Sequence, residues 1–417
     1  MSDSSLFNLF VNGFDEEPTV LSFELLEGIS GDDELNVSFL ASSNCSESLL
    51  GQEANFSFEF EGKKEFYNGT VTGCSEEQSA NGFSRYALCV KTVQHSLSKE
   101  KNCAVYCDTD AETVIRSLLK KAGISAKCKL NSFYEMDFKM QYNESDLDFL
   151  QRLLEDFGIT EFARHSESGS ELFISDGDDF EEQRVNFAKS RLQAEDGGNF
   201  FYGYGHSPLR PGMAFNAFGE TFIVCSVFHS GSQEAAFGLK DKTDGYACQI
   251  AAFSKRMLRN LPHSKIKPQV PGVIVARVEG FKGSSAALDE QGRYTVRLPF
   301  DEENHNGALA SSPVHLAQNF SGEDCGIHFP LKKDTPILLA FEDGDIDRPV
   351  ALGSLPREKC KSPVAKNNSH QSILKTSSGI KFLFDDSTGN LDIEAPADIS
   401  IKAAGKLVLQ GEMVEVN

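Results

Sequence analysis

The sequence contains no tryptophan and only 14 prolines among its 417 residues. Its core aromatic area must therefore come from the 33 phenylalanines, and a chain rich in Phe, Val, Thr and Gly favours β-strands. No window approaches the roughly 18 uninterrupted apolar residues of a membrane-spanning helix. The first ten residues lack the basic and apolar regions of a signal peptide, so we expect assembly in the cytoplasm, and any export must use another route.

Basic residues are also scarce. The 40 Lys and Arg residues face 62 Asp and Glu residues, for a net charge of −22. A nucleic-acid-binding protein normally shows a basic face, and none is visible, so nucleic acid is not expected as a partner. Acidity on this scale keeps an assembly component soluble before it meets its partners. The length predicts two to four domains.

Recognisable catalytic and metal-binding motifs are missing. None of the ten cysteines forms a C-x-x-C pair and no histidine cluster accompanies them, which argues against zinc and for reduced thiols. The acidic stretches 175–179 and 342–347 lack the ligand spacing of an EF-hand, so turns are expected there. His206 stands beside Ser207, but the chain has no G-x-S-x-G elbow. We therefore predict no catalytic residue, no cofactor, no metal site and no enzyme activity.

Short alternating strands are predicted from residue 7 to about residue 105. Residues 21–25, 55–60 and 85–90 each alternate between apolar and polar side chains. Turn residues separate them, a pattern typical of antiparallel barrels or sandwiches.

Two helices interrupt this pattern. The first is predicted near residues 111–122, with Thr109 and Glu112 as a capping box and Gly123 after its end. The second is predicted near residues 146–157, with Ser145 as N-cap and Gly158 after its end. Their buried faces are expected to consist of Val114, Ile115, Leu118 and Leu119 in the first helix and Leu147, Leu150, Leu153, Leu154 and Phe157 in the second.

The C-terminal residues carry an eight-residue repeat. Its apolar pairs are Leu391 with Ile393, Ile399 with Ile401, and Leu407 with Leu409. Each octad is interpreted as one short strand and a tight turn, which cannot bury its apolar pair within its own chain. Three identical chains around a threefold axis would bury these pairs in a stalk about 20 Å long, at ~4.8 Å per strand. The alternative is an ordinary meander packed on the preceding domain.

Three segments resemble the VgrG family of type VI secretion spikes and the related hubs and spikes of phage tails. Residues 142–159 resemble the family's helix between two hub barrels. Residues 289–301 resemble its D-x-x-G-R-V-x-V-x-F-x-W-D strand pair, and residues 326–353 its G-x-x-F-P … G-D-x-D-R-P-x-x-x-G segment. Phe300 and Pro313 stand where the family usually has tryptophan. The residues that match the motif, and to which the resemblance gives a structural role, are Asp289, Gly292, Arg293, Pro330, Gly344, Asp345, Asp347, Arg348, Pro349 and Gly353.

The resemblance implies a mainly β homotrimer. Each chain would contribute two hub β-barrels with inserted helices (residues 1–262), an OB-like domain (271–355), a linker (356–370) and a strand of an intertwined triple-stranded β-helix stalk (371–417). The predicted trimer core of the stalk consists of Leu391, Ile393, Ile399, Ile401, Leu407 and Leu409.

The function implied is that of the structural spike and hub of a contractile injection apparatus, which caps a hexameric tube and punctures a target membrane. The partners implied are the tube protein, baseplate components, a PAAR-type tip protein or effector at the C-terminal end and, transiently, the target membrane. After assembly in the cytoplasm, the apparatus would deliver the chain outside the cell or into a target cell. Two alternatives stay open: a tail-associated cell-wall hydrolase with an unrecognised site, and a trimeric receptor-binding fibre.

Overall fold

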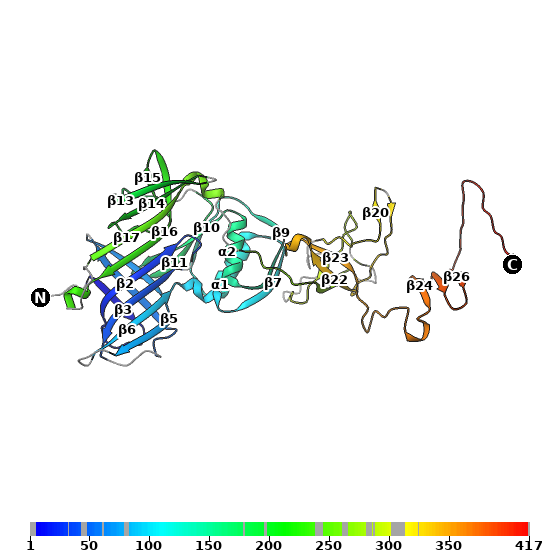
Figure 1. Cartoon of the computed structure of the whole chain (residues 1–417), viewed down its shortest axis with the longest axis horizontal. Coiled ribbons are helices and arrows are strands. Elements are labelled where there is room, and N and C mark those ends of the chain that lie inside the picture. The colour runs from blue at the N-terminus through cyan, green and yellow to red at the C-terminus, as the bar shows by residue number, and fades with distance from the viewer. Residues whose placement is uncertain are drawn as a thin grey trace.

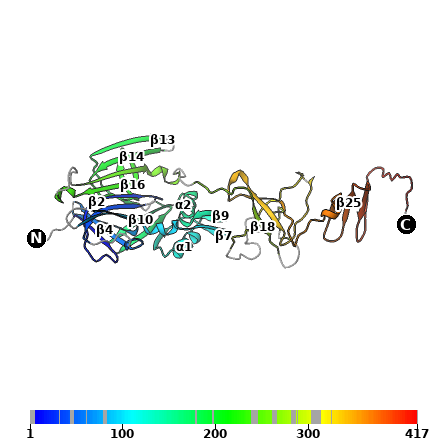
Figure 2. The same ribbon diagram turned by 60° about the horizontal axis from the view of Figure 1, so that its bottom comes forward.

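The structure, a computed structural model, describes residues 6–31, 33–42, 48–60, 62–78, 83–177, 180–195, 198–237, 245–260, 266–280, 286, 288–301, 313–323 and 325–415. We call the described parts of residues 1–262, 271–355 and 371–417 the hub, the neck and the stalk. They follow one another along an elongated molecule (Figure 1), and a second view shows the same order (Figure 2). No helix in the described part of the chain is long and apolar enough to cross a membrane.

A 12-stranded sheet forms most of the hub. Along its main path the strands follow in the order β1-β4-β5-β6-β3-β2-β16-β17-β14-β13. Their bounds are β1 Phe7–Val11, β2 Thr19–Gly28, β3 Glu34–Ala41, β4 Glu53–Phe60, β5 Lys63–Gln78, β6 Ser84–Lys91, β13 Lys189–Glu195, β14 Gly198–Gly205, β16 Glu220–Ser232 and β17 Gly245–Ser254. Two further strands, β12 (Glu181–Glu182) and β15 (Met213–Ala217), pair off this path. The pairing of β2 with β16 joins the N-terminal half of the hub to the half that follows the helices.

Phenylalanine fills the hub core, as the lack of tryptophan requires. The predicted alternating segments lie in β2, β4 and β6, and their apolar residues point into one core. The ring of Phe23 lies 4.8 Å from that of Phe56 and 5.1 Å from that of Phe58, all three fully buried. Closely packed aromatic pairs of this kind stabilise a core beyond their buried area.

Both predicted helices are present, α1 (Ala111–Lys121) and α2 (Asp146–Asp156). Their predicted apolar faces are buried, except that Phe157 follows the end of α2 and is only half-buried. Ser145 caps α2 as predicted, because its hydroxyl accepts from the Asp148 N–H at 3.0 Å. The predicted capping box of α1 is wrong. Asp110 is the N-cap and accepts from the Thr113 N–H at 2.9 Å. Thr109 still belongs to the strand that precedes the helix, where it pairs with Met136 of another strand.

Smaller sheets surround the helices. β7 (Lys101–Asp110) and β9 (Glu135–Ser145) form a hairpin-like pair that reaches toward the neck (Figure 1). β8 (Ala126–Lys129), β10 (Thr160–Ser166) and β11 (Gly169–Ser175) form a three-stranded sheet. Short 3-10 helices lie at Val93–Ser98, Glu234–Phe237, Lys255–Asn260, Glu342–Gly344 and Lys366–Asn368.

The neck contains a four-stranded antiparallel sheet in the order β19-β18-β22-β23. Its strands are β18 (Ile274–Val278), β19 (Val296–Arg297), β22 (Pro336–Phe341) and β23 (Pro349–Ser354). The neck also contains a separate two-stranded pair, β20 (Ser321–Gly322) with β21 (Cys325–Gly326).

The stalk contains one three-stranded sheet of β24 (Gln371–Lys375), β25 (Lys381–Asp385) and β26 (Asn390–Glu394). Of the three octads, only the first is a strand, since no strand is present from residue 395 to residue 415. The expectation of one strand per octad is therefore wrong for a single chain. A strand needs a hydrogen-bonding neighbour, and this part of the chain has none of its own. The mainly β fold is confirmed, while the domain limits stay predictions.

Candidate functional site at the neck and in the stalk

The acidic segment that follows β22 folds into a tight turn. The Asp345 N–H donates to the carbonyl of Glu342, and the Arg348 N–H donates to the carbonyl of Asp345, both at 2.9 Å. Asp343 and Gly344 have φ values of 54° and 78°, in the left-handed region that such a turn requires. Arg348 pairs locally with Glu342 at 2.5 Å. The predicted turn is confirmed.

This turn presents Asp347 to the hub. One carboxylate oxygen of Asp347 accepts from the Lys139 ammonium at 2.9 Å, and the other accepts from the Met140 N–H at 3.1 Å. Lys139 and Met140 belong to β9, about 200 positions earlier in the chain. The guanidinium of Arg152 in α2 lies 3.6 Å from the same carboxylate. Asp347 therefore links the neck to both the β7–β9 pair and α2.

The cationic side chains at this junction are largely buried. Arg152 is 2% exposed, and its guanidinium donates to Glu144 at 2.7 Å and to the Met140 carbonyl at 2.8 Å. Burial alone would lower the pKa of Lys139, but Asp347 and Asp156 outweigh it and raise this pKa above its usual range. Lys139 is therefore charged at neutral pH, and the junction is an ionic cluster that needs every partner present.

An apolar contact reinforces the ionic one. Ile346, beside Asp347, is fully buried. The core that contains it is shared between hub and neck: Val105, Cys107, Phe138 and Met140 of the β7–β9 pair pack with neck residues such as Ile337. A shared apolar core resists bending, so the junction can transmit force along the molecule.

The other motif residues build turns and strand ends. Asp289 accepts from the Arg293 N–H at 2.8 Å and pairs with its guanidinium at 2.6 Å, while Gly292 takes a φ of 74° between them. Pro349 begins β23, and Gly353 lies at the irregularity where β22 and β23 shift register. Pro330 is exposed, and no contact explains its place in the motif. Apart from Pro330, these motif residues therefore shape turns and strand ends of the neck.

The apolar residues of the stalk are uncovered in the single chain. The six residues predicted for the trimer core are between 49% and 69% exposed: Leu391, Ile393, Ile399, Ile401, Leu407 and Leu409. Two residues that the repeat pattern missed extend this face, because Phe382 lies opposite Ile393 and Phe384 opposite Leu391. Both phenylalanines are also part-exposed. Cross-strand alternation around Leu383 was the signal that could have revealed them.

A buried charge cluster in the hub was not predicted. Glu27 accepts from Arg210 at 2.5 Å and lies 3.1 Å from Nε2 of His229 and 3.9 Å from Nε2 of His165. Arg210 also pairs with Glu65 at 3.2 Å. Burial alone would raise the pKa of Glu27, but Arg210 and the two histidines outweigh it and lower the pKa to about 2. These residues are far apart in sequence, and only the fold brings them together.

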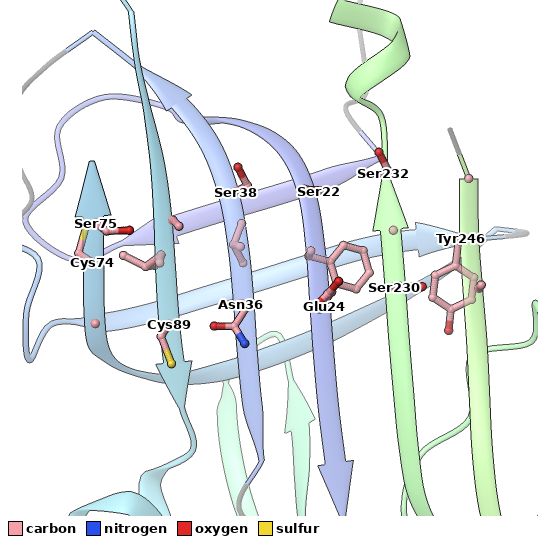
Figure 3. A pocket seen from close by; sticks show the side chains of 18 of the residues that line it. Ser22, Glu24, Asn36, Ser38, Cys74, Ser75, Cys89, Ser230, Ser232 and Tyr246 are labelled. Carbon is pink, nitrogen blue, oxygen red and sulfur yellow. The ribbon is translucent and has the colours of Figure 1, made fainter. Parts of the chain in front are cut away.

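The outer face of the hub sheet is hollowed. A depression of about 1100 Å³ runs over β5, β6, β3, β2, β16 and β17 (Figure 3). Small polar side chains line it, among them Ser22, Ser38, Ser75, Ser230 and Ser232. Glu24 and Asn36 are the larger polar groups that Figure 3 shows there.

The described residues offer little for catalysis or metal binding. No group of three or more His, Cys, Asp or Glu residues within them could hold a metal ion. Asp176, in the first acidic stretch, accepts from the backbone N–H groups of Asn131 and Ser132, while Asp178 and Asp179 lie outside the described residues. Nδ1 of His206 lies 2.7 Å from the Tyr246 carbonyl. Nine of the ten cysteines are free thiols, and Cys45 lies outside the described part.

Known proteins are similar to this chain in sequence. Residues 26–202 match the model of the phage tail baseplate hub (GPD). The chain is 21% identical over 436 residues to the type VI secretion system spike protein VgrG1a of Pseudomonas aeruginosa, covering 79% of this chain and 67% of the relative. It is 26% identical to VgrG1b of the same organism, covering 73% and 54%. The chain thus spans about half to two thirds of the length of these relatives.

Solved structures share the fold. The c3393 protein of E. coli, a component of the type VI secretion system with structural similarity to the T4 bacteriophage tail proteins gp27 and gp5, superposes with a TM-score of 0.67 at 19% identity, covering 83% of this chain and 99% of that one. The Francisella PdpA–VgrG complex gives a TM-score of 0.61 at 9% identity, with 93% and 80% covered. The chain is therefore similar in sequence to VgrG spike proteins, matches the phage tail baseplate hub model over part of its hub, and shares the fold of these proteins.

Proposed function

We propose that three copies of this chain form the hub and spike of a contractile injection apparatus, which caps a hexameric tube and punctures a target membrane. The observation that carries the proposal is the uncovered apolar face of the stalk, from Phe382 to Leu409. Residues that are about half exposed over such a length cost free energy in water, ~25 cal/mol per Å² of apolar surface. Two further copies of the same face would cover it.

The hub, the neck and the stalk would have different roles, in the order in which they follow one another along the molecule. The hub would sit on the tube and baseplate, and the stalk would lead. The neck would transmit the thrust, since Asp347 and the shared core around Ile346 tie it to the hub. In the trimer, strands supplied by neighbouring chains would leave no free edge to peel away. No step of this function is chemical, so we propose that the chain itself is not an enzyme.

The partners at the far end are also proposals. A tip protein or an effector would be carried at the C-terminal end of the stalk. One relative of this chain, 22% identical and matched over 37% of its own length, is named the actin cross-linking toxin VgrG1 of Vibrio cholerae. Delivery by the apparatus would take the chain outside the producing cell or into a target cell.

The test of the proposal is the mass of the purified chain in solution. Light scattering at micromolar concentration should give three times the chain mass of 45.8 kDa. A strict monomer would remove the proposal, because a single chain leaves the stalk face uncovered. No observation on the described residues favours a hydrolase or a receptor-binding fibre over the spike.

A further inference from the structure

One short strand beside the helices has an open edge. β8 pairs with β11 alone among the described strands, and the two strands run parallel. The Leu172 N–H donates to the Ser125 carbonyl at 2.9 Å. Because the backbone groups of successive strand residues point to opposite sides, those of residues 125, 127 and 129 face β11, whereas those of Ala126 and Cys128 face the open edge. Backbone groups at an open edge are a template for a further strand.

A groove lies beside this edge. Its volume is about 470 Å³, and its walls are formed by Arg116, Leu119 and Lys120 of α1 and by residues 123–126 and Cys128. Gly123 has a φ of 69° and reverses the chain after α1, where the Ile124 N–H donates to the Leu119 carbonyl at 2.9 Å. This turn brings α1 and β8 to two sides of the same groove.

Basic side chains surround the groove, although the chain as a whole is acidic. Residues 113–134 contain no Asp or Glu, and their five basic residues are all exposed: Arg116, Lys120, Lys121, Lys127 and Lys129. Arg116 pairs with Glu112, but an ion pair so exposed contributes little and leaves the guanidinium open to another carboxylate. The net charge of −22 hides this local basic surface, which is complementary to an acidic partner.

The alternation along β8 indicates which side chains an added strand would carry. Ala126 and Cys128 pack against the apolar core of the two helices, whereas Lys127 and Lys129 point away from that core and are exposed. Side chains on the same face of neighbouring strands interact, and pairs of opposite charge are favourable. Apolar side chains therefore fit beside Ala126 and Cys128, and acidic side chains fit beside the two lysines.

We infer that β8 and the basic groove beside α1 bind an extended segment of another protein, in which acidic and apolar residues alternate, as an added strand. Backbone hydrogen bonds from Ala126 and Cys128 would supply affinity, and the basic side chains would supply selectivity. All the residues of this site belong to one chain. The inference therefore goes beyond the proposed spike function and does not depend on the trimer.

Hydrogen exchange on the full-length chain tests the site, with a synthetic peptide of alternating glutamate and valine as the probe. The amides of Ala126 and Cys128 should exchange rapidly in the protein alone and about tenfold more slowly with the peptide bound. The Lys127 amide, which faces β11, is the internal control and should not change.

Two results of this experiment would overturn the inference. Slow exchange of Ala126 and Cys128 before the peptide is added would mean that the assembled chain already covers the edge. Unchanged exchange at high peptide concentration would mean that the edge does not accept a strand. Either result leaves the proposed function standing, because light scattering tests the trimer separately.

Charge variants test the selectivity of the groove. Lys127→Glu should weaken binding of the labelled peptide about tenfold in fluorescence anisotropy, since the acidic side chains then meet a like charge. The matched control is Lys99→Glu, the same change at an exposed position outside the groove, which should bind as the wild type does. Equal loss in both variants would show that only overall charge matters. Equal protection of Ala126 and Cys128 by an oligothymidylate of the same charge would also overturn the inference.

Methylated peptides test the backbone pairing itself. Methylation of the peptide N–H groups at all valines or at all glutamates leaves the charge unchanged and removes the donors of one edge only. One of these two peptides should lose about tenfold in affinity, because only one set of N–H groups faces β8. Unchanged binding of both peptides would contradict an added strand.

Discussion

At the scale of single residues, Asp347 carries the most structural information. It stands within the most specific sequence motif of the chain, and it lies at the contact between the neck and the hub. Its carboxylate accepts from Lys139 and Met140 of the hub and lies 3.6 Å from Arg152. The segment looks like a cation-binding loop in sequence. In the fold, its Asp347 connects the neck to the hub.

Asp347→Asn should therefore weaken the junction. The amide keeps the shape but removes the charge that compensates Lys139 and Arg152, at an expected cost of about 2 kcal/mol of unfolding free energy. Urea denaturation measures this loss. The control is Asp343→Asn, an exposed position at φ 54° in the same turn, where asparagine is well tolerated. Equal effects of the two variants would contradict the role of Asp347.

The hub charge cluster predicts acid sensitivity. Burial lowers the pKa of His165 from 6.5 to about 4. The unfolded chain therefore binds a proton at His165 more readily, so the stability from this residue is complete above pH 6.5 and is lost as the pH falls toward 4. The loss is about 3 kcal/mol, at ~1.4 kcal/mol per pH unit. Glu27 acts in the same direction between pH 4.5 and about 2, whereas Asp33, whose pKa burial raises, acts in the opposite direction.

His165→Asn isolates this contribution. The asparagine oxygen can replace Nδ1 as the acceptor of the Asn68 N–H, a bond of 3.1 Å in the wild type. Unfolding free energies measured between pH 8 and pH 4 should converge for the two proteins as the pH falls. Parallel profiles would show that His165 does not titrate on unfolding.

At the scale of elements, the local residue pattern predicts where strands form, but it does not predict what covers their apolar faces. In β1, β3 and β4 alternation buries one face, as the residue pattern predicts. In the stalk, the same alternation leaves Phe382, Phe384 and the octad residues facing solvent. A period-two pattern predicts that one face must be covered, but it does not say which chain covers it.

Leu407→Asp tests what covers the stalk face. In the proposed trimer, three carboxylates would meet at the axis without compensation, so the variant should fail to form stable trimers. Light scattering should report the monomer mass. The control is Lys406→Asp, a change to the same residue one position earlier in the expected turn, which should keep the trimer. A trimeric Leu407→Asp variant would show that Leu407 does not lie at the axis.

At the scale of the whole molecule, the hub, the neck and the stalk follow one another along the length of the molecule (Figure 1). The neck shares a core with the hub, and the stalk offers an uncovered apolar face. Each of these features fits the proposed assembly and the proposed transmission of thrust.

A mechanical role predicts no release of sugar or peptide fragments from peptidoglycan. Incubation of the purified chain with peptidoglycan, followed by chromatography of the soluble fraction, should match a buffer blank, with a known hydrolase as the positive control. Fragment release that persists after repeated purification would support the hydrolase alternative instead.

Much of this architecture could be predicted without coordinates. Helix α2, the alternation in β2, β4 and β6, and the turn before Arg348 follow from local pattern and turn chemistry, because each depends on residues close in sequence. The cap of α1 was misassigned because Thr109 and Asp110 are both good N-cap residues. Where β7 ends decides between them, and that depends on its pairing with β9.

The amino-acid sequence by itself determined the mainly β character, the two helices, the eight-residue repeat and the absence of recognisable catalytic motifs. Only the tertiary structure brought Asp347 to Lys139, Glu27 to Arg210, and β2 beside β16 in one sheet. The physical reason is the sequence separation over which each interaction acts. Dihedral preference and periodicity act over a few residues. Charge pairs can instead join distant residues, such as Lys139 and Asp347, which are 208 positions apart and which only the folded chain brings to 2.9 Å.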